Sequence, residues 1–574
     1  MTIAEQAASP AFRDQLVDML VKMCAIDTTP NGDVEAFAAN ESAIFDILES
    51  WFEECGFEAA RTERRPMNPA IERHPFFSQL YYTRTEDRPG GLDAAACYAN
   101  RSNLLLFVDG EQRDASGVDH AINAHIDVIA PFIPPRVEGD IVYGRGACDD
   151  KGNAVAMMGA IRLVADWLRD RGRRLNRHLT CMLVLDEESG GNGSLSLAID
   201  RDLKQRYQSL TVLEICENRI HPANRGAVWY KVEAKVPDTH LLEAAAYVVA
   251  QLEREGRAIR AESRHALFPH RPVQTCHGII GDCGDHPSRI NGEVAFDIVV
   301  DGGDAAGART LVTDVIQFAL DEYCGVYGDK TKVNDATTGR PKVDHHYDLE
   351  DAPHGLSITV HGATGHMGSI FENDGAITKM MTMVRALMRS REAIERVTGG
   401  SVVFRQNGWA DPSHLVLEGG QGFLPTHELD EVQRRLTTAV HRGAGHYLRM
   451  IGRDGDAAGL FDVTFDKLHN AAFDGDPDSP DMRNAIDCAR RAGIWRDDPI
   501  RGWDVSSDAR IFAKEYDDLP VITTGPGSLN HAHSDFEQID VNEMIKAAEF
   551  LAHYILKQTG TSEEDQGTTN EHGS

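Results

Sequence analysis

The sequence predicts an α/β fold: a mainly parallel sheet flanked by helices, with an enlarged α+β domain inserted into it. At both ends of the chain, short apolar runs alternate with helical patterns, as in parallel sheets built from strand–helix–strand units. In the middle, apolar and polar residues alternate along the strands, which is typical of sheets with one exposed face. The chain of 574 residues is also too long for one ordinary core.

The first segment of the α/β domain is predicted over residues 1–228. It begins with helices over residues 11–60, followed by a stretch rich in Pro, Arg and Gly, residues 61–100, which we expect to be loop or insertion. Buried strands are predicted where short runs are apolar and β-branched, at HAINAHIDVIA, LTCMLVLDEE and SLTVLEICE. A helix is predicted at NAVAMMGAIRLVADWL, where apolar side chains recur at helical spacing.

The inserted domain is predicted over residues 229–450. Its strands are expected at AVWYKVEAKV, EVAFDIVV and GLSITVHG, covered by helices at LLEAAAYVVAQLERE and GAITKMMTMVRALM. The α/β pattern returns over residues 451–560, with a strand at DDLPVITTGPG and a final helix at VNEMIKAAEFLAHYILK. The polar residues 561–574 are expected to be a disordered tail.

The composition excludes some classes of function. A formal net charge of −32 leaves no basic stripe to neutralise phosphates, which argues against a nucleic-acid partner. The ten cysteines are scattered without a CxxC pair, as expected for buried free thiols in a reducing compartment. The N-terminus lacks the pattern of a secretion signal, and no apolar run is long enough to cross a membrane. We therefore expect a cytoplasmic protein with no membrane partner.

Residues that commonly bind metals fall at the ends of the predicted strands. In an open α/β sheet, sites form beyond the carboxyl ends of the strands. These residues are His125 and Asp127, Glu187 and Glu188, Glu214 and Glu217, and His533, with Asp149 in the glycine-rich turn YGRGACDDKGN. Each alone is better explained by a hydrogen-bonded core histidine or a solvated acidic turn. Their recurrence at successive strand ends is harder to attribute to chance.

Carboxylates and imidazoles without thiolates suit a catalytic site for zinc, cobalt or manganese. Two metal ions that share one bridging carboxylate would need about five protein ligands. A water between them would become a nucleophile near neutral pH, because such ions lower its pKa from about 15.7 towards 7. The expected cofactors are therefore two divalent ions, with Zn²⁺ the first choice and Co²⁺ or Mn²⁺ as alternatives.

Several motifs, in order along the chain, resemble the M20 family of di-zinc peptidases and deacylases. They are AHIDV, YGRGACDDKGN, LDEESGGNGS, LEICENRIHPANRGAVW, GATGHMGS, LEGGQGFLPT and AHSDFE. The resemblance implies the following roles: His125 as a ligand of the first zinc, Asp127 as its orienting carboxylate, Asp149 as the bridging ligand, Glu187 as the general base, and Glu188 and His533 as ligands of the second zinc. It favours Glu214 as the other ligand of the first zinc, with Glu217 left open, and makes Asp150 a helix N-terminal charge.

The resemblance also assigns residues of the inserted domain, which would be a lid and dimerisation domain. His366 in GATGHMGS would polarise the scissile carbonyl, and Asn291 and Arg289 are candidates for binding substrate. The lid would be about twice the usual size, because residues 237–350 precede the histidine motif. A homodimer is expected, although so large a lid could instead cover the site within one chain.

The function implied is hydrolysis of an amide or peptide bond next to a free carboxylate, in a small acyl amino acid or dipeptide. Two alternatives remain open: a zinc-dependent aminohydrolase of different bond specificity, and a non-catalytic scaffold protein that keeps the fold.

Overall fold

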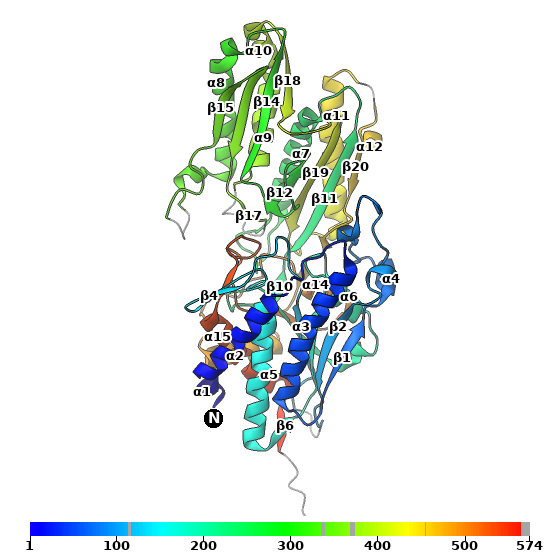
Figure 1. Cartoon of the computed structure of the whole chain (residues 1–574), viewed down its shortest axis with the longest axis vertical. Helices are drawn as coiled ribbons and strands as arrows, with labels where there is room; N and C mark the ends of the chain where they lie inside the picture. Colours follow the sequence, from blue (N-terminus) through cyan, green and yellow to red (C-terminus); the bar gives the residue numbers. More distant parts are fainter. Residues whose placement is uncertain (113–115, 335–338, 368–373, 454, 564–574) are drawn as a thin grey trace, which may run out of the picture. The chain divides into compact units, whose positions relative to one another are not determined.

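A computed structural model describes residues 1–112, 116–334, 339–367, 374–453 and 455–563. The chain divides into two compact units (Figure 1). Unit 1 comprises Met1–Asn224 and Phe473–Ser574, and unit 2 comprises Arg225–Ala472.

A seven-stranded sheet forms the centre of unit 1. Its order is β1-β2-β7-β3-β8-β23-β9. Its strands are β1 (Ala60–Pro66), β2 (Ser102–Val108), β7 (Leu179–Val184), β3 (His120–His125), β8 (Ser209–Leu213), β23 (Val521–Thr524) and β9 (Ile220–His221). The four strands β7, β3, β8 and β23 are mutually parallel, whereas β1, β2 and β9 pair antiparallel. The α/β fold class is thus confirmed, with a sheet that is parallel at its centre and mixed at its edges.

Helices pack around this sheet. The longest are α2 (Pro10–Cys24), α3 (Val34–Cys55), α5 (Lys151–Arg171), α13 (Pro480–Ala492) and α15 (Val541–Thr559), and the shorter ones are α1 (Ile3–Ala7), α4 (Ala94–Cys97), α6 (Asn192–Ala198) and α14 (Ala509–Glu515). Helix α5 contacts β3 of the sheet and also α2, α3 and α15. Its first turns, residues 151–161, are buried on every side. None of the described helices has the length and apolar character needed to cross a membrane.

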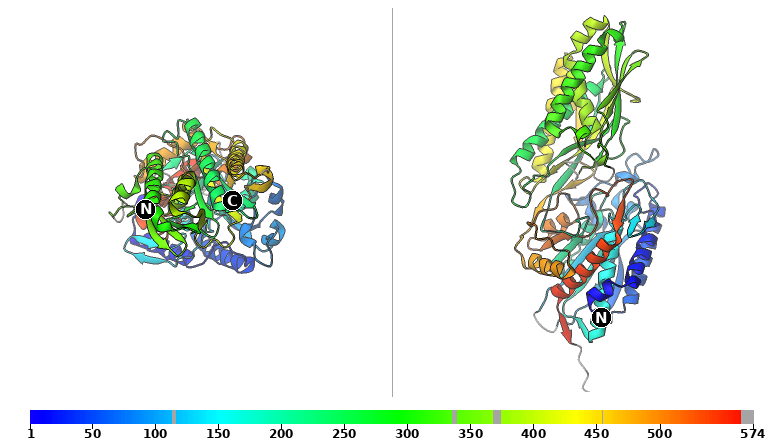
Figure 2. Two further views of the ribbon diagram at one scale, coloured as in Figure 1. Left: turned by 90° about the horizontal axis from the view of Figure 1, so that it is seen from above. Right: turned by 90° about the vertical axis from the view of Figure 1, so that its left-hand side faces the viewer.

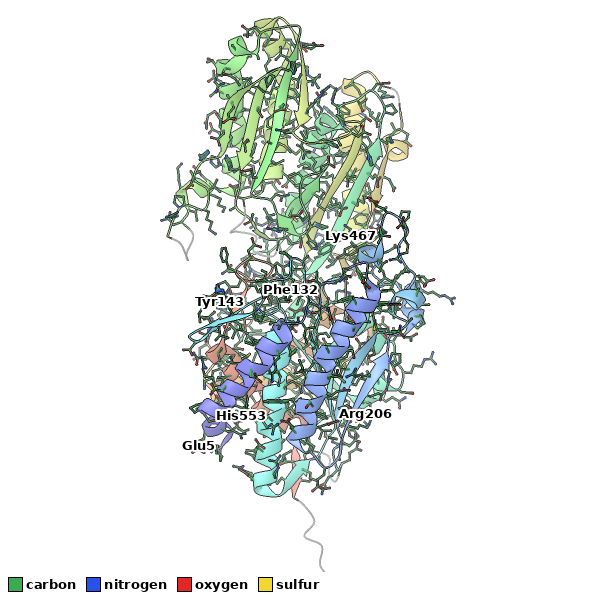
Figure 3. All side chains as sticks on the ribbon, in the orientation of Figure 1. Glu5, Phe132, Tyr143, Arg206, Lys467 and His553 are labelled. Atoms are coloured by element: carbon green, nitrogen blue, oxygen red, sulfur yellow. The ribbon has the colours of Figure 1, made fainter. Side chains whose placement is uncertain are left out.

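The expectation of loop over residues 61–100 is wrong at its start. Strand β1 pairs with β2 in register from Ala60↔Val108 to Pro66↔Ser102. It was missed because its sequence, ARTERRP, is polar, and its residues are only partly buried at the edge of the sheet. Unit 1 also has a small three-stranded sheet of order β24-β5-β4. Its strands are β4 (Arg136–Glu138), β5 (Ile141–Tyr143) and β24 (Gln538–Asp540), and Figure 3 labels Tyr143 at the end of β5.

Unit 2 contains two antiparallel sheets. One has the order β12-β19-β11-β20, with β21 also paired to β11, and the other has the order β15-β16-β14-β18. The strands of the first are β11 (Gly226–Lys235), β12 (Thr275–Ile280), β19 (His414–Phe423), β20 (Phe461–Thr464) and β21 (His469–Asn470). Those of the second are β14 (Glu293–Asp301), β15 (Tyr347–Ala352), β16 (Gly355–His361) and β18 (Ser401–Gln406).

The helices of unit 2 gather on one side of its strands (Figure 2). They are α7 (Leu241–Glu262), α8 (Arg309–Tyr327), α9 (Ala376–Arg389), α10 (Arg391–Thr398), α11 (Leu429–Met450) and α12 (Ala457–Leu460). Burial along β14 alternates strictly, so one face of the strand packs inward and the other meets solvent. This alternation is the pattern from which the α+β character of the insertion was predicted.

The borders of the inserted unit differ from the predicted residues 229–450. Unit 2 continues to Ala472, because β20 and β21 still pair with β11 after α11 has ended. The chain re-enters unit 1 where β22 (Phe473–Asp474) pairs with β10 (Ala223–Asn224). At the other end, Thr561–Glu563 form β25 against β6 (Arg173–Leu175), and residues 564–574 of the predicted tail lie outside the described residues.

Candidate metal centre

Two histidines of unit 1 face the two oxygens of one carboxylate. His125 Nε2 lies 3.2 Å from Asp149 Oδ1, and His533 Nε2 lies 3.1 Å from Asp149 Oδ2. His533 Nε2 is also 3.1 Å from Glu188 Oε1. Asp149 therefore stands between two imidazoles that are more than 400 residues apart in sequence.

The ligand-type atoms form two groups that share Asp149. The first comprises His125, Asp149, Asp150 and Glu214, and the second comprises Asp149, Glu188 and His533. Within each group the candidate ligand atoms lie within 4.8 Å of one another. The five predicted metal ligands are thus brought together, and the carboxylate in the glycine-rich turn belongs to both groups. Asp150, which was expected only as a helix N-terminal charge, joins the first group.

The parallel strands explain this convergence. Strands β3, β7, β8 and β23 run in the same direction, so their carboxyl ends meet at one edge of the sheet. His125 is the last residue of β3, Glu214 directly follows β8, Glu188 follows β7, and His533 lies in the loop after β23. Asp149 enters from the turn before α5.

Asp127 holds both the first histidine and the two glutamates. Its Oδ1 accepts a hydrogen bond from the Glu187 N–H at 3.1 Å, and its Oδ2 accepts one from the Glu188 N–H at 3.0 Å. The Asp127 carbonyl lies 3.1 Å from His125 Nδ1, and Oδ1 lies 3.5 Å from the same nitrogen. A proton on Nδ1 leaves the buried Nε2, which has no hydrogen-bond partner among the described residues, as the ligand atom.

Glu537 fixes the turn that carries Asp149. Its Oε1 accepts hydrogen bonds from the N–H groups of Gly146 at 2.9 Å, Cys148 at 3.3 Å and Asp149 at 3.1 Å. Its other oxygen pairs with Arg145, and both side chains are buried. The prediction missed this role, although Arg145 and Glu537 both lie within quoted motifs, because their pairing across more than 390 residues has no local signal.

A second buried carboxylate, that of Asp186, holds the turn that carries Glu187. Asp186 is buried and has a left-handed backbone with φ of 58°, which is uncommon for a residue other than glycine. Its carboxylate accepts hydrogen bonds from Tyr82 at 2.8 Å, Tyr98 at 2.6 Å and Arg101 at 2.6 Å. These contacts hold the turn that presents Glu187 and Glu188, and the sequence interpretation missed them too.

The buried carboxylates of the cluster make positive charge favourable at this position. Burial opposes ionisation of His533, but Glu188 and Asp149 outweigh it and raise the pKa of His533 to about 10. Burial likewise opposes a charge on His125, yet Asp150 and the other carboxylates raise its pKa well above the usual range. Burial raises the pKa of Glu187, Glu188 and Glu214, and neighbouring carboxylates add to this rise. At Glu188, His533 acts in the opposite direction. Such an excess of carboxylates is what cations would neutralise.

The two glutamates left open as ligands of the first metal, Glu214 and Glu217, have different surroundings. Glu214 is buried and belongs to the first group. Glu217 belongs to neither group of described residues; its Oε1 accepts a hydrogen bond from Ser528 at 3.3 Å, and its other oxygen lies 3.8 Å from Arg496. Asp150 is the N-cap residue of α5 without a side-chain cap, and its Oδ2 accepts a hydrogen bond from the His125 N–H at 3.2 Å.

The remaining predicted residues belong to unit 2. Arg289 lies in β13 (Arg289–Ile290), directly across from His366 in β17 (Gly365–His366). The side chain of His366 lies outside the described residues. Asn291 donates a hydrogen bond from Nδ2 to the Gly278 carbonyl at 2.7 Å, and the nearest recorded acid to Arg289 is Asp285 at 3.9 Å. Their predicted roles towards substrate stay predictions.

The chain is similar to known proteins in sequence and in fold. A peptidase M20 domain-containing protein of Schizosaccharomyces pombe is 25% identical over 202 residues, covering 35% of this chain and 40% of that protein. A [LysW]-lysine/[LysW]-ornithine hydrolase of Sulfurisphaera tokodaii is 35% identical over 80 residues, 14% of this chain and 21% of that protein. The matches therefore span less than half the length of these curated relatives.

Two solved structures share the fold over nearly the whole chain. Human carnosine dipeptidase 1 matches with a TM-score of 0.53 at 13% identity, covering 97% of this chain and 99% of that one. The dipeptidase Dug1p of Saccharomyces cerevisiae matches with a TM-score of 0.52 at 12% identity, covering 97% and 98%. The family model for peptidase family M20/M25/M40 matches residues 121–557, more than half of the sequence, and the chain belongs to this family.

Proposed function

We propose that the protein is a metal-dependent hydrolase that cleaves an amide or peptide bond next to a free carboxylate in a small acyl amino acid or dipeptide. The observation that carries the proposal is the shared carboxylate of Asp149, which lies between two groups of ligand atoms. A carboxylate that is shared in this way can bind two neighbouring cations, one through each oxygen. Membership in a peptidase family supports hydrolysis as the reaction.

The donor atoms fit two divalent cations. His125, Asp149 and Glu214 would hold one ion, and Asp149, Glu188 and His533 would hold the other. Because the donors are imidazole nitrogens and carboxylate oxygens without thiolates, zinc is the first choice and cobalt or manganese are alternatives. When bound, the ions would polarise the substrate carbonyl and make water a stronger acid.

Glu187 is suited to move the proton. Although it adjoins Glu188, it belongs to neither group of candidate ligands in the described chain, so its carboxylate is free for another task. Burial, and then the charge of Asp508, raise the pKa of Glu187, which suits a group that must hold a proton between two steps. In the reaction, Glu187 takes a proton from the attacking water. The water oxygen bonds to the carbonyl carbon, the C–N bond breaks, and the proton passes to the amine.

The decisive experiment is a substrate panel. The purified protein is stripped with a chelator, reloaded with zinc, cobalt or manganese, and assayed for amine release from N-acyl amino acids and dipeptides. Each substrate is paired with its C-terminal amide, which lacks the free carboxylate. We expect release that requires metal and falls strongly with the amides. Equal rates on the amides would contradict the carboxylate requirement, and no release from any substrate would favour the scaffold alternative.

The roles of the unit 2 residues belong to the same proposal. We propose that His366 polarises the substrate carbonyl and that Arg289 and Asn291 bind substrate. The His366→Ala variant should lower turnover far more than it lowers bound metal. Loss of metal in that variant would contradict the assignment. The expected homodimer is tested by light scattering of the purified protein.

A further inference from the structure

Three side chains of the second sheet of unit 2 converge on one point. His345 Nε2 lies 3.1 Å from both carboxylate oxygens of Asp348, and His361 Nε2 lies 2.8 Å from Asp348 Oδ2. The three candidate ligand atoms lie within 4.8 Å of one another. This cluster is separate from the centre in unit 1 and takes no part in the proposed hydrolysis.

The sheet itself brings these residues together. Asp348 lies in β15, His345 precedes that strand, and His361 is the last residue of β16, which pairs antiparallel with β15. On its other side β16 pairs with β14, where Glu293 is directly opposite His361. Three adjacent strands therefore carry Asp348, His361 and Glu293, and His345 lies two residues before the first of them.

Glu293 lies beside the second nitrogen of the His361 ring. Its Oε2 lies 3.4 Å from His361 Nδ1, the ring nitrogen that faces away from Asp348. A carboxylate at that nitrogen keeps the proton on Nδ1 and leaves the Nε2 lone pair directed at the cluster. Metal-binding histidines commonly have this kind of partner on their second nitrogen.

A neighbouring cluster shows the opposite arrangement. His346, next in sequence to His345, has Nε2 3.2 Å from Asp329 and 3.7 Å from the thiol of Cys324. Its Nδ1 accepts a hydrogen bond from the Lys379 ammonium at 3.1 Å, so the neutral ring must carry its proton on Nε2. With the proton on Nε2, that nitrogen has no lone pair for a metal.

We propose that His345, Asp348 and His361 form a third divalent metal site, selective for zinc or a similar transition ion. Two imidazoles and one carboxylate are a ligand set that such ions prefer, and water would complete the coordination. The side chains of His345 and Asp348 are 56% and 52% exposed, so an ion reaches them directly from solvent. Binding would tie β15 to the end of β16 on the surface of unit 2.

Bound zinc tests the proposal. The full chain is equilibrated with zinc at a free concentration fixed by a chelator, and bound metal is counted by mass spectrometry. His345→Ala and His361→Ala should each bind one zinc fewer per chain than the unchanged protein. The matched controls are His354→Ala, an exposed histidine between the same two strands, and His346→Ala, and both should keep the full count.

A second variant tests the orienting carboxylate. Glu293→Gln should keep the site but weaken it about 10- to 100-fold, because the loss of such a partner typically has that effect on metal affinity. An unchanged count in both His345→Ala and His361→Ala would overturn the proposal, as would loss of zinc in His346→Ala with His345→Ala unaffected. These readouts compare variants of unit 2, whereas the proposed hydrolysis is measured by amine release, so either can fail alone.

Discussion

The two units each contain a cluster of histidines and carboxylates, and the clusters are built in different ways. The cluster of unit 1 takes its residues from five segments that span His125 to His533, and nearly all of them are buried. The cluster of unit 2 takes its residues from the 17 positions between His345 and His361 and is largely exposed. The first depends on the whole domain, the second on a pair of adjacent strands.

The supports differ as well. In unit 1, Asp127 and Glu537 hold the turns that present the ligands, and both are buried. In unit 2, the carboxylate beside the His361 ring is that of Glu293, and its side chain is 70% exposed. The comparison teaches that ligands in a catalytic centre need buried partners that hold them in position, whereas a site that only binds an ion can be assembled on a surface.

The largest effects are expected when the central carboxylate of each cluster is replaced by an amide. Asp149→Asn should release both ions of unit 1 and abolish turnover, because the same side chain belongs to both groups of ligands. Asp348→Asn should remove only the proposed zinc of unit 2 and leave turnover unchanged. Metal counts and amine release on the same preparations check both. If Asp149→Asn lost one ion and kept the other, the carboxylate would not be shared.

The next test separates chemistry from binding. Glu187→Gln should keep the metal of unit 1 and lower turnover about 10²- to 10⁴-fold, the usual contribution of a general base. Glu217→Gln is the matched control, because that glutamate lies outside both groups of described ligands. Turnover within a few-fold of normal in Glu187→Gln would assign the base to another residue.

A smaller effect is expected from the support behind His125. Asp127→Asn replaces one of the two oxygens that accept the N–H groups of Glu187 and Glu188, so one of these hydrogen bonds is lost. Turnover or metal affinity should fall about 10- to 100-fold, as for other partners that orient ligands. Asp119→Asn, which directly precedes β3 at the end away from the site, is the control and should leave both unchanged. An equal loss in both variants would mean a general effect on the strand.

The smallest effect concerns the pH dependence of stability in unit 1. His120 is buried between Ser209 and Thr211, and burial lowers its pKa to about 3. Between the ordinary histidine pKa of about 6.5 and this value, the unfolded chain binds a proton that the folded one does not. Stability should therefore fall with falling pH, by about 1.4 kcal/mol per pH unit from this group. Denaturant titrations of His120→Gln should show a correspondingly flatter dependence, and an identical slope would refute the assignment.

The sequence predicted most of the centre in unit 1 because its strands are buried on both faces. Such strands appear as short continuous apolar runs, and the polar residue that ends each run marks the edge of the sheet. His125, Glu188 and Glu214 were found in this way or through the family resemblance. Spacing alone left Glu217 as an alternative, because the distance from a strand end to a ligand depends on the loop that follows.

What the sequence did not predict are pairings between distant polar residues. Arg145 with Glu537, and Arg101 with Asp186, meet only because the sheet brings their segments together. Strand β1 escaped prediction because an edge strand needs few apolar residues. The cluster of unit 2 was also missed, since one histidine, an aspartate three positions later and a second histidine are a common surface spacing.

The loop that supplies His533 also supplies Glu537, four residues later, which clamps the turn of Asp149. Both come from the part of the chain that the ribosome makes after all of unit 2. During synthesis the nascent chain has β3, β7 and β8 without the fourth parallel strand, and Asp149 and Glu188 without His533. The two groups of candidate ligands are therefore complete only when the segment that follows unit 2 packs against the first segment of unit 1.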